Sequence, residues 1–217
     1  MLDLTMLIGT CDKYQFLWSK FIKLYEKYWD HNIVINKYVL CETIPFNYDG
    51  FLSISCGKIE STDGIKYAID KINTKYVLWL QDDYFFRKKI YYNKFKYYYD
   101  YINKYKIDRF GIHHDTHLYT KNHIVDNIYR LDQHSQYTIS LQASIWNTEF
   151  FKFCLKHDQP ENPWQFEIQG SKRLNNTYVH NIVFEKQTDY WYQEAMKKGQ
   201  FTPDYYKIVE QENLHSV

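Results

Sequence analysis

The stretch 65–83, IKYAIDKINTKYVLWLQDD, carries the clearest structural pattern in the chain. Its first part has apolar side chains at helical spacing, at Ile65, Ala68, Ile69 and Ile72. This spacing predicts a helix over 65–72, and Ser61–Gly64 offers capping residues in front of it. The run Tyr76–Leu80 is apolar throughout, as expected of a central strand covered on both faces. A helix and then a buried strand ending in two carboxylates are therefore predicted here.

The residues before this stretch predict the rest of a sheet. Leu4–Gly9 is a short apolar run, which indicates a buried strand. Apolar residues recur at helical spacing over 13–29, with Asp12 placed as a helix N-cap. Strands are predicted over 32–40, which is rich in β-branched residues, and over 51–55. The order strand–helix–strand–strand–helix–strand predicts an α/β fold, in which helices flank a mainly parallel central sheet.

The residues after this stretch are less regular. Helices are predicted over 91–104, 148–156, 164–173 and 188–198, with a polar tail after the last one. Strands are predicted over 109–114, 127–131, 136–141 and 178–184. The sequence contains no repeat and no low-complexity linker, and its 217 residues suit one large domain. We therefore predict a single domain over 1–217.

Composition excludes several classes of protein. Lys and Arg number 27 against 26 Asp and Glu, and a net charge of +1 disfavours a dedicated nucleic-acid binder. No apolar run approaches the ~20 residues of a membrane helix. The N-terminal residues include Asp3 and no basic region, so they do not resemble a signal peptide. The four cysteines are widely spaced without a Cys-x-x-Cys pair, which favours free thiols in a reducing cytoplasm.

Aromatic residues make up 20% of the chain, with 23 Tyr. An AT-rich genome explains this, since Lys, Asn and Ile are abundant as well. Tyrosine-rich surfaces also suit sugars, whose C–H faces stack on rings while their hydroxyl groups need polar partners. Composition alone leaves both explanations open.

Asp82 and Asp83 are the strongest local sign of chemistry. In an open parallel sheet, ligands bind beyond the carboxyl ends of the strands. Adjacent carboxylates repel each other there unless they share a cation, and a hard cation such as Mg²⁺ or Mn²⁺ also binds waters and phosphate oxygens. The pair therefore suggests a metal that links the protein to a diphosphate. The plain alternative is an exposed turn after a strand, because turns are rich in Asp.

Segment 62–86, together with Gly9–Asp12 at the end of the first strand, resembles the family-2-like glycosyltransferases of the GT-A fold. Their nucleotide half ends in an acidic DxD motif after a helix and an apolar strand. The resemblance implies a nucleotide-binding half over about 1–86 and an acceptor and catalytic half over 87–217. It implies that Asp83 binds Mn²⁺ or Mg²⁺. Gln81 stands where the family usually has an acid.

The same resemblance implies roles for the residues around this metal. Gly9, Thr10 and Asp12 would line the base and ribose of the nucleotide, because small and polar residues let a base approach the backbone. Asp63 would lie at the rim of that pocket. Asp82 would take over part of the role of the missing acid.

A second resemblance lies downstream, in Ser140–Asn147 (SLQASIWN) and Asn162–Ser171 (NPWQFEIQGS). Both are similar to segments of small glycosyltransferases from bacteria and large DNA viruses. Glu167 matches an acid that faces the donor sugar, which implies a general base; the alternative is an acid favoured by the dipole of a helix N-terminus. Lys172 and Arg173 would contact the leaving diphosphate, or they are the usual cations near a helix C-terminus.

The resemblance implies inverting, metal-dependent transfer of a sugar from a nucleotide-diphosphate sugar, most commonly UDP-linked, to a carbohydrate acceptor. Such a protein would act in the cytoplasm, and it could be virus-encoded. A sugar nucleotidyltransferase is disfavoured because the first loop has one glycine and no arginine. A non-catalytic carbohydrate-binding module stays open. His113–His117 and His180 could join a metal site, although surface or core histidines are commoner.

Overall fold

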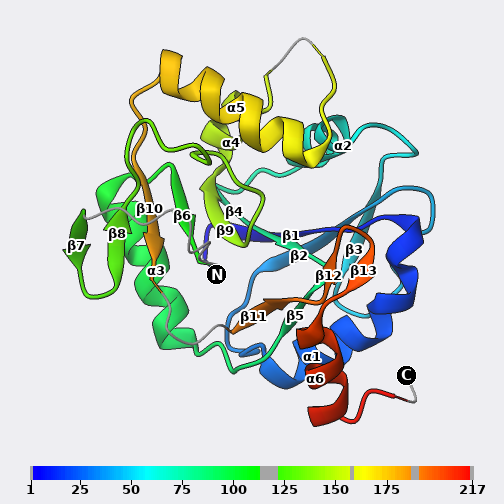
Figure 1. The fold of residues 1–217 in the computed structure, drawn as a ribbon. Coiled ribbons are helices and arrows are strands. Elements are labelled where there is room, and N and C mark those ends of the chain that lie inside the picture. Colours follow the sequence, from blue (N-terminus) through cyan, green and yellow to red (C-terminus); the bar gives the residue numbers. More distant parts are fainter. Residues whose placement is uncertain (1, 113–121, 157–158, 187–190, 216–217) are drawn as a thin grey trace.

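Four parallel strands form one half of the central sheet of the computed structural model, which describes residues 2–112, 122–156, 159–186 and 191–215 (Figure 1). They lie side by side in the order β3, β2, β1, β4. Their bounds are Leu4–Gly9 for β1, Asn36–Cys41 for β2, Leu52–Ser55 for β3 and Tyr76–Gln81 for β4. Gly9 pairs in register with Gln81 on one side and with Leu40 on the other. The carboxyl ends of β1, β2 and β4 therefore meet at one edge.

The second half of the sheet is mixed and continues from β4 in the order β9, β6, β10, β8, β7. Its strands are β6 (Arg109–Gly111), β7 (His123–Val125), β8 (Ile128–Arg130), β9 (Ser144–Asn147) and β10 (Ile182–Glu185). β9 runs antiparallel to both β4 and β6, while β6 and β10 are parallel. β8 and β7 close this edge in antiparallel pairing. The predicted fold class, α/β with helices flanking a central sheet, is confirmed.

Helices cover both faces of the sheet (Figure 1). One face carries η1 (Asp12–Leu17, a 3₁₀ helix), α1 (Trp18–Tyr28), α3 (Tyr92–Tyr105) and α6 (Pro203–Gln211). The other face carries α2 (Ser61–Ile69), α4 (Thr148–Cys154) and α5 (Pro163–Thr177). Side chains of β4 alternate between the two cores, with Leu78 on the first face and Trp79 on the second. This alternation is the physical reason why β4 is apolar at every position.

The helix boundaries differ from the prediction at two capping positions. Asp12 does not cap α1, because a turn of 3₁₀ helix beginning at Asp12 precedes it. Ser61–Gly64 lies inside α2, and Glu60 is the N-cap residue. Asp12 therefore lies in the first turn of η1, and Ser61 lies in the first turn of α2, rather than at the N-cap position of a helix. No described helix is long and apolar enough to cross a bilayer.

Two predictions in the second half are wrong. Residues 136–141 form no strand. Of the predicted helix over 188–198, residues 188–190 lie outside the described residues, and the rest contains β11 (Tyr192–Glu194) and β12 (Met196–Lys197) instead. β11 pairs antiparallel with β5 (Tyr84–Phe86), which follows the two aspartates. β12 forms a hairpin with β13 (Gln200–Phe201), and Lys198 and Gly199 turn it with φ of +52° and +77°. Such a two-residue turn matches the twist of the strands that it joins.

Two further predictions agree with the structure only in part. The polar tail contains the amphipathic helix α6. The predicted strand over 109–114 begins as β6, but His113–His117 lie outside the described residues. All four cysteines are free thiols.

Candidate active site

Gly9 ends β1 against a large ring. A Cβ atom at this position would lie 2.6 Å from the indole ring of Trp79 on β4. The Trp79 indole N–H donates to the carbonyl of Leu141 at 2.9 Å, which fixes the ring under Gly9. Packing of Trp79 thus requires a glycine at position 9. The explanation expected from the sequence was different, namely that a small residue lets a nucleotide base approach the backbone.

Asp82 lies inside the protein, with 2% of its surface exposed. Its Oδ2 accepts hydrogen bonds from the Thr10 hydroxyl and, at 3.0 Å, from the indole N–H of Trp18. The same indole N–H lies 2.8 Å from the Thr10 hydroxyl oxygen. Burial, and then the charge of Asp83, raise the pKa of Asp82 well above its usual range. Thr10 and Trp18 therefore hold this carboxyl group at the carboxyl ends of β1 and β4.

Replacing Trp18 with phenylalanine should lower the free energy of unfolding by about 1–3 kcal/mol, the cost of leaving a buried acceptor without one donor. The ring contact with Phe46, at 4.9 Å between centroids, can persist in the variant. Urea denaturation followed by circular dichroism measures the change. An unchanged unfolding free energy would show that the indole N–H does not support Asp82.

Asp83 is positioned by its own backbone. Its carbonyl accepts the N–H groups of Ala195 at 2.7 Å and Met196 at 3.2 Å, which ties it to the segment between β11 and β12. Its Oδ1 is buried and has no hydrogen-bond partner within the described part of the chain. Burial, and then the charge of Glu194, raise the pKa of Asp83 to about 7. A divalent cation would offset both the burial of the Asp83 carboxylate and its repulsion by Glu194.

Asp83 and Glu194 fit a hard cation that is coordinated mainly by water and by phosphate oxygens of a ligand. The described residues include no group of three His, Cys, Asp or Glu side chains that could hold a metal. Among the described carboxylates, Asp83 has a buried oxygen without a hydrogen-bond partner, and the charge of Glu194 raises its pKa. Mg²⁺ and Mn²⁺ suit such a site, because one or two carboxylates, waters and phosphate oxygens usually complete their coordination.

Tyr84 follows the two aspartates and is influenced by several acidic groups. Its hydroxyl lies 3.5 Å from Glu194, its partner in the β5–β11 register, and Gln142 forms a hydrogen bond with it. Burial raises the pKa of Tyr84, and so do the charges of Glu194, Asp83 and Glu167. The charges of both predicted acids, Asp83 and Glu167, therefore influence this one phenol.

Two further side chains support this centre. The hydroxyl of the buried Tyr192 donates to the carbonyl of Gln81 and accepts its N–H at 2.8 Å, which fixes the end of β4. Gln142 places a buried Oε1 that has no partner in the described structure. The sequence did not predict a place in the site for five residues, namely Trp18, Tyr84, Gln142, Tyr192 and Glu194. Gln142 lies within the SLQASIWN segment, which is the one signal that could have found it.

Glu167 lies in the second turn of α5. The helix begins with a capping box of Asn162 and Gln165, and Glu167 lies beyond its first turn, so the dipole alternative has little support. Its Oε1 accepts the N–H of Leu141 at 2.7 Å and the hydroxyl of Ser140 at 3.1 Å. These bonds orient the carboxylate toward the segment that leads into β9.

A buried arginine balances the charge of Glu167. Arg109 on β6 is 4% exposed, and it donates to the Ser144 hydroxyl at 3.1 Å and to the Thr138 carbonyl at 3.0 Å. Burial lowers the pKa of Arg109 to about 10, and the charge of Glu167 opposes this shift. The buried guanidinium and the carboxylate of Glu167 therefore attract each other inside the protein.

Asp12 braces the loop after β2. Its Oδ1 accepts the N–H groups of Thr43 and Ile44, each at 3.0 Å, and its Oδ2 accepts the Thr43 hydroxyl. Its own N–H donates to Glu42 at 2.8 Å. These hydrogen bonds, that of the Thr43 hydroxyl first, lower the pKa of Asp12. Asp12 thus joins the ends of β1 and β2, and a contact with a nucleotide stays a prediction.

The remaining predicted residues lie on the helices. Asp63 is half-buried in the first turn of α2, and Lys172 is exposed on α5. Arg173 forms a bidentate ion pair with Glu161, at 2.6 and 2.9 Å. The N–H and hydroxyl of Thr62 bind the carbonyl of Glu161, so this pair fastens α5 to α2.

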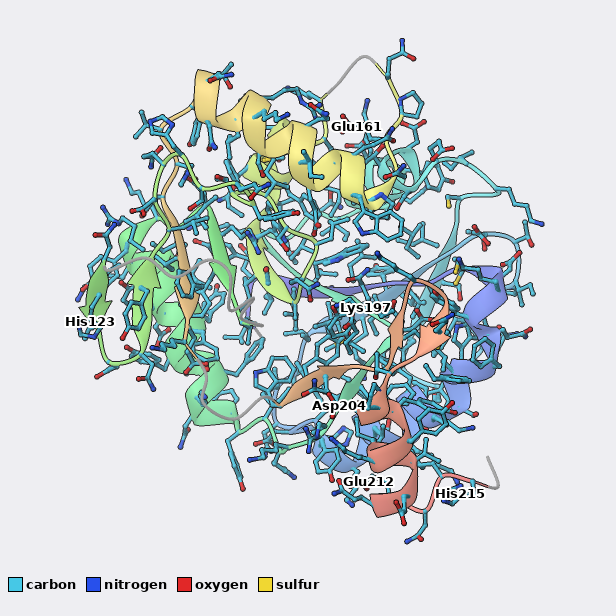
Figure 2. The ribbon with its side chains drawn as sticks, in the orientation of Figure 1. His123, Glu161, Lys197, Asp204, Glu212 and His215 are labelled. Atoms are coloured by element: carbon cyan, nitrogen blue, oxygen red, sulfur yellow. The ribbon has the colours of Figure 1, made fainter. Side chains whose placement is uncertain are left out.

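The cations near Asp83 belong to other elements. Figure 2 shows Glu161, the partner of Arg173, near α5 and far from Lys197 on the β12–β13 hairpin. Lys197 lies 3.4 Å from Glu194, and the charge of Lys13 lowers the pKa of Asp83. Lys13 and Lys197 are therefore better placed than Arg173 for a diphosphate at Asp83.

His180 lies just before β10, away from this centre. It is 3% exposed, its N–H donates to Gln133 Oε1 at 3.1 Å, and its carbonyl accepts from Gln133 Nε2 at 2.6 Å. Burial lowers the pKa of His180 to about 4, so the ring is neutral near pH 7. These two hydrogen bonds are made by its backbone, and its buried ring Nε2 has no hydrogen-bond partner in the described structure.

No protein-family model and no curated protein matches this sequence. Solved structures do resemble the fold. S. aureus TarS 1–349 in complex with UDP-GlcNAc has 11% sequence identity and a TM-score of 0.61, over 99% of this chain and 66% of that one. TarS 1–349 in complex with UDP has 12% identity and a TM-score of 0.57, over 88% of this chain and 60% of that one.

A longer TarS structure matches with 11% identity and a TM-score of 0.56, over 99% of this chain and 39% of that one. This chain thus spans just under two thirds of the shorter TarS chains and about two fifths of the longer one. At such low identity the likeness shows the fold and no more. The chain has the GT-A-like α/β fold of these TarS structures.

Proposed function

We propose that the chain is a glycosyltransferase that moves a sugar from a UDP-linked donor to a carbohydrate acceptor. The observation that carries this proposal is the buried, unpartnered Oδ1 of Asp83 at the carboxyl end of β4. It lies where ligands of parallel sheets bind, and the charges of Asp83 and Glu167 both raise the pKa of Tyr84. The fold is shared with TarS structures that contain UDP-GlcNAc and UDP, which supports a nucleotide-sugar donor.

In this proposal the nucleotide binds along the ends of β1, β2 and β4. Thr10 and Asp12 line the base and ribose beside Gly9, and Asp63 lies at the rim of the pocket. Asp83 holds the cation, which when bound neutralises charge on the leaving diphosphate. Asp82 does not contact the cation through its Oδ2, which accepts hydrogen bonds from Thr10 and Trp18. Its role is to fix the backbone next to Asp83.

Glu167 acts as the general base. It takes the proton of an acceptor hydroxyl while that oxygen forms a bond to the anomeric carbon of the sugar. The bond from this carbon to the phosphate oxygen breaks, and its electron pair leaves with the diphosphate. Attack from the side opposite the leaving group inverts the anomeric configuration. Lys13 and Lys197 stabilise the diphosphate, and Lys172 and Arg173 contribute less because of their positions on α5.

A donor panel tests this proposal. UDP-, GDP- and dTDP-sugars are incubated with the protein and Mn²⁺, Mg²⁺ or EDTA, and release of the nucleoside diphosphate is measured. We expect a UDP-sugar to be hydrolysed with a cation and to be stable in EDTA. UDP with Mn²⁺ should also raise the melting temperature, because a ligand that binds only the native state stabilises it. No hydrolysis of any donor and no thermal shift would overturn the proposal, whereas a shift without hydrolysis would leave a nucleotide-binding module.

A further inference from the structure

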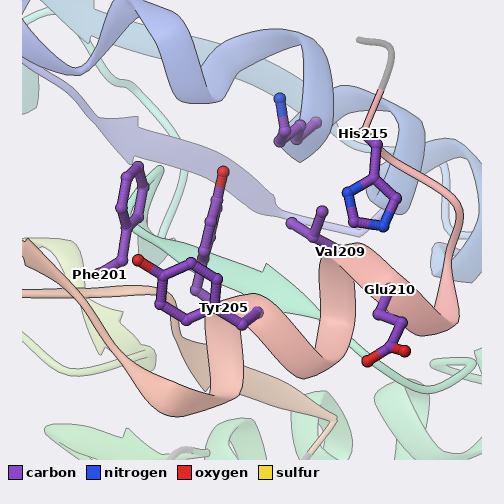
Figure 3. A pocket seen from close by; sticks show the side chains of 7 residues that line it. Phe201, Tyr205, Val209, Glu210 and His215 are labelled. Carbon is purple, nitrogen blue, oxygen red and sulfur yellow. The ribbon is translucent and has the colours of Figure 1, made fainter.

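A second surface carries a hollow of about 530 Å³ beside α6 (Figure 3). Its aromatic lining is Phe201 on β13 with Tyr205 and Tyr206 on α6. Polar and charged side chains also line it, from Lys20, Glu210 and His215. Figure 3 shows Phe201 and Tyr205 on one side of the hollow and Glu210 and His215 on the other. The hollow thus combines ring faces with hydrogen-bonding groups.

The rings of this hollow continue as a row along the protein surface. Phe201 stacks on Tyr205 with 4.0 Å between ring centroids, and it lies 6.0 Å from Tyr206. In the other direction, Phe16 lies 5.8 Å from Phe201, and Tyr14 lies 6.2 Å from Phe16. Contacts between η1, β13 and α6 therefore form one aromatic row.

This row leads from the hollow to the Asp83 centre. Tyr14 is anchored by its N–H to the carbonyl of Cys11, at 2.9 Å, close to the end of β1. The charges of Asp83 and Asp82 add to burial in raising the pKa of Tyr14. At the hairpin end, Ala195 binds the Asp83 carbonyl and also accepts the N–H of Thr202, next to Phe201, at 3.0 Å. Ala195 therefore links the residue after Phe201 to the backbone of Asp83.

Exposure of these rings indicates a binding surface. Phe16 is 50% exposed, Phe201 37% and Tyr206 60%. Contiguous exposed apolar surface usually marks an interaction site. A sugar chain fits better than a protein partner. The exposed ring surfaces of Phe16 and Tyr206 can accept the C–H faces of sugars. Lys20, Glu210 and His215 offer partners for the hydroxyl groups of a sugar in the hollow.

We propose that the row from Tyr14 to Tyr206, with the hollow at its end, binds the acceptor glycan. The inference rests on the proposed function, since it places the reacting end of the glycan at Glu167 and Asp83. Sugars remote from the reaction lie along Phe16 and Phe201 and reach the hollow. Binding energy from these remote sugars holds the acceptor end in place for transfer.

The test uses an immobilised panel of oligosaccharides and the double variant Phe16→Ala with Tyr206→Ala. Both side chains are exposed, so circular dichroism and melting temperature should match those of wild type. Tyr91→Ala is the matched control, because Tyr91 is 62% exposed and lies at the start of α3. We expect wild type and the control to bind glycans on the panel. The double variant should bind the same glycans at least about tenfold more weakly, a loss of ~1.4 kcal/mol.

Three outcomes would overturn the inference. They are a wild type that binds no glycan on the panel, a double variant that binds as wild type does, and a wild-type dimer that the double variant abolishes in sedimentation velocity. The last outcome would make the row an interface between copies of the chain. Isothermal titration with UDP and Mn²⁺ separates this test from that of the proposed function. Glycan binding at the row without UDP binding or donor hydrolysis would contradict the transferase and leave the glycan site standing.

Discussion

Replacing Asp83 with asparagine should weaken binding of UDP in the presence of Mn²⁺ by on the order of 100-fold or more. Loss of a group that merely supports a metal ligand already costs about 10–100-fold in metal affinity, and Asp83 is proposed as the ligand itself. Isothermal titration measures UDP affinity with Mn²⁺ and with EDTA. EDTA should weaken wild-type binding to a similar extent and change the variant little.

Asp100→Asn is the control, since Asp100 lies exposed on α3 in an ion pair with Lys96. It should bind UDP with wild-type affinity. Full affinity of the Asp83 variant, or full wild-type affinity in EDTA, would contradict a metal at Asp83.

The stability of the Asp83 variant provides an internal check on folding. Because the pKa of Asp83 is raised from 3.8 to about 7, the native state binds more protons than the unfolded chain within this range. Its contribution to unfolding free energy is therefore favourable at low pH and is lost as pH rises through about 7. Asparagine mimics the protonated form, so above about pH 7 the variant should be at least as stable as wild type without ligand. Urea denaturation across this range measures the difference, and a variant that loses stability above it would show that the burial argument is wrong.

Replacing Glu167 with glutamine should lower the rate of sugar transfer by roughly 10²–10⁴, the usual contribution of a positioned general base. Glutamine keeps the size of the side chain, and its Oε1 can still accept from Leu141 and Ser140. UDP affinity should change little, since the residue acts on the acceptor hydroxyl. The rate is measured as release of UDP from the donor, with water or a glycan as acceptor.

Glu149→Gln serves as the control, because Glu149 has an 81% exposed side chain on α4. Transfer by the Glu167 variant at the wild-type rate would contradict its role as base. NMR of the product reports the anomeric configuration, and a retained configuration would contradict the inverting mechanism even if Glu167 is essential.

The parallel half of the fold could be predicted because its signals are local. β1 and β4 are apolar at nearly every position, since both faces of each strand are covered. The predicted and observed bounds of β1 are the same, Leu4–Gly9, and those of β4 differ by one residue at its end, Gln81.

The second half depends on pairings that are remote in sequence. β9 is four residues long, and it is a strand because it fits between β4 and β6. The helical pattern over 188–198 gives way to β11, whose residues pair with β5 about a hundred positions earlier. Tertiary pairing of this kind overrides local propensity.

The sequence motifs point to the acids of the candidate site, but they do not reveal which residues surround these acids. Asp82, Asp83 and Glu167 stand in motifs whose order is visible along the chain. Glu194 reaches Tyr84 only through the β5–β11 register, and Trp18 reaches Asp82 only through the packing of α1. Arg173 has the positive charge that a diphosphate contact needs, but in the structure it forms an ion pair with Glu161. The sequence could not reveal this partner.

A crystal structure of this chain with UDP and Mn²⁺ tests the central claim most directly. We expect Mn²⁺ between the Asp83 carboxylate and the diphosphate, with the uridine along the carboxyl ends of β1 and β2. Asp82 should keep its bonds to Thr10 and Trp18. Anomalous scattering identifies the metal, and UDP bound elsewhere, or a diphosphate at this edge without Mn²⁺ at Asp83, would contradict the account.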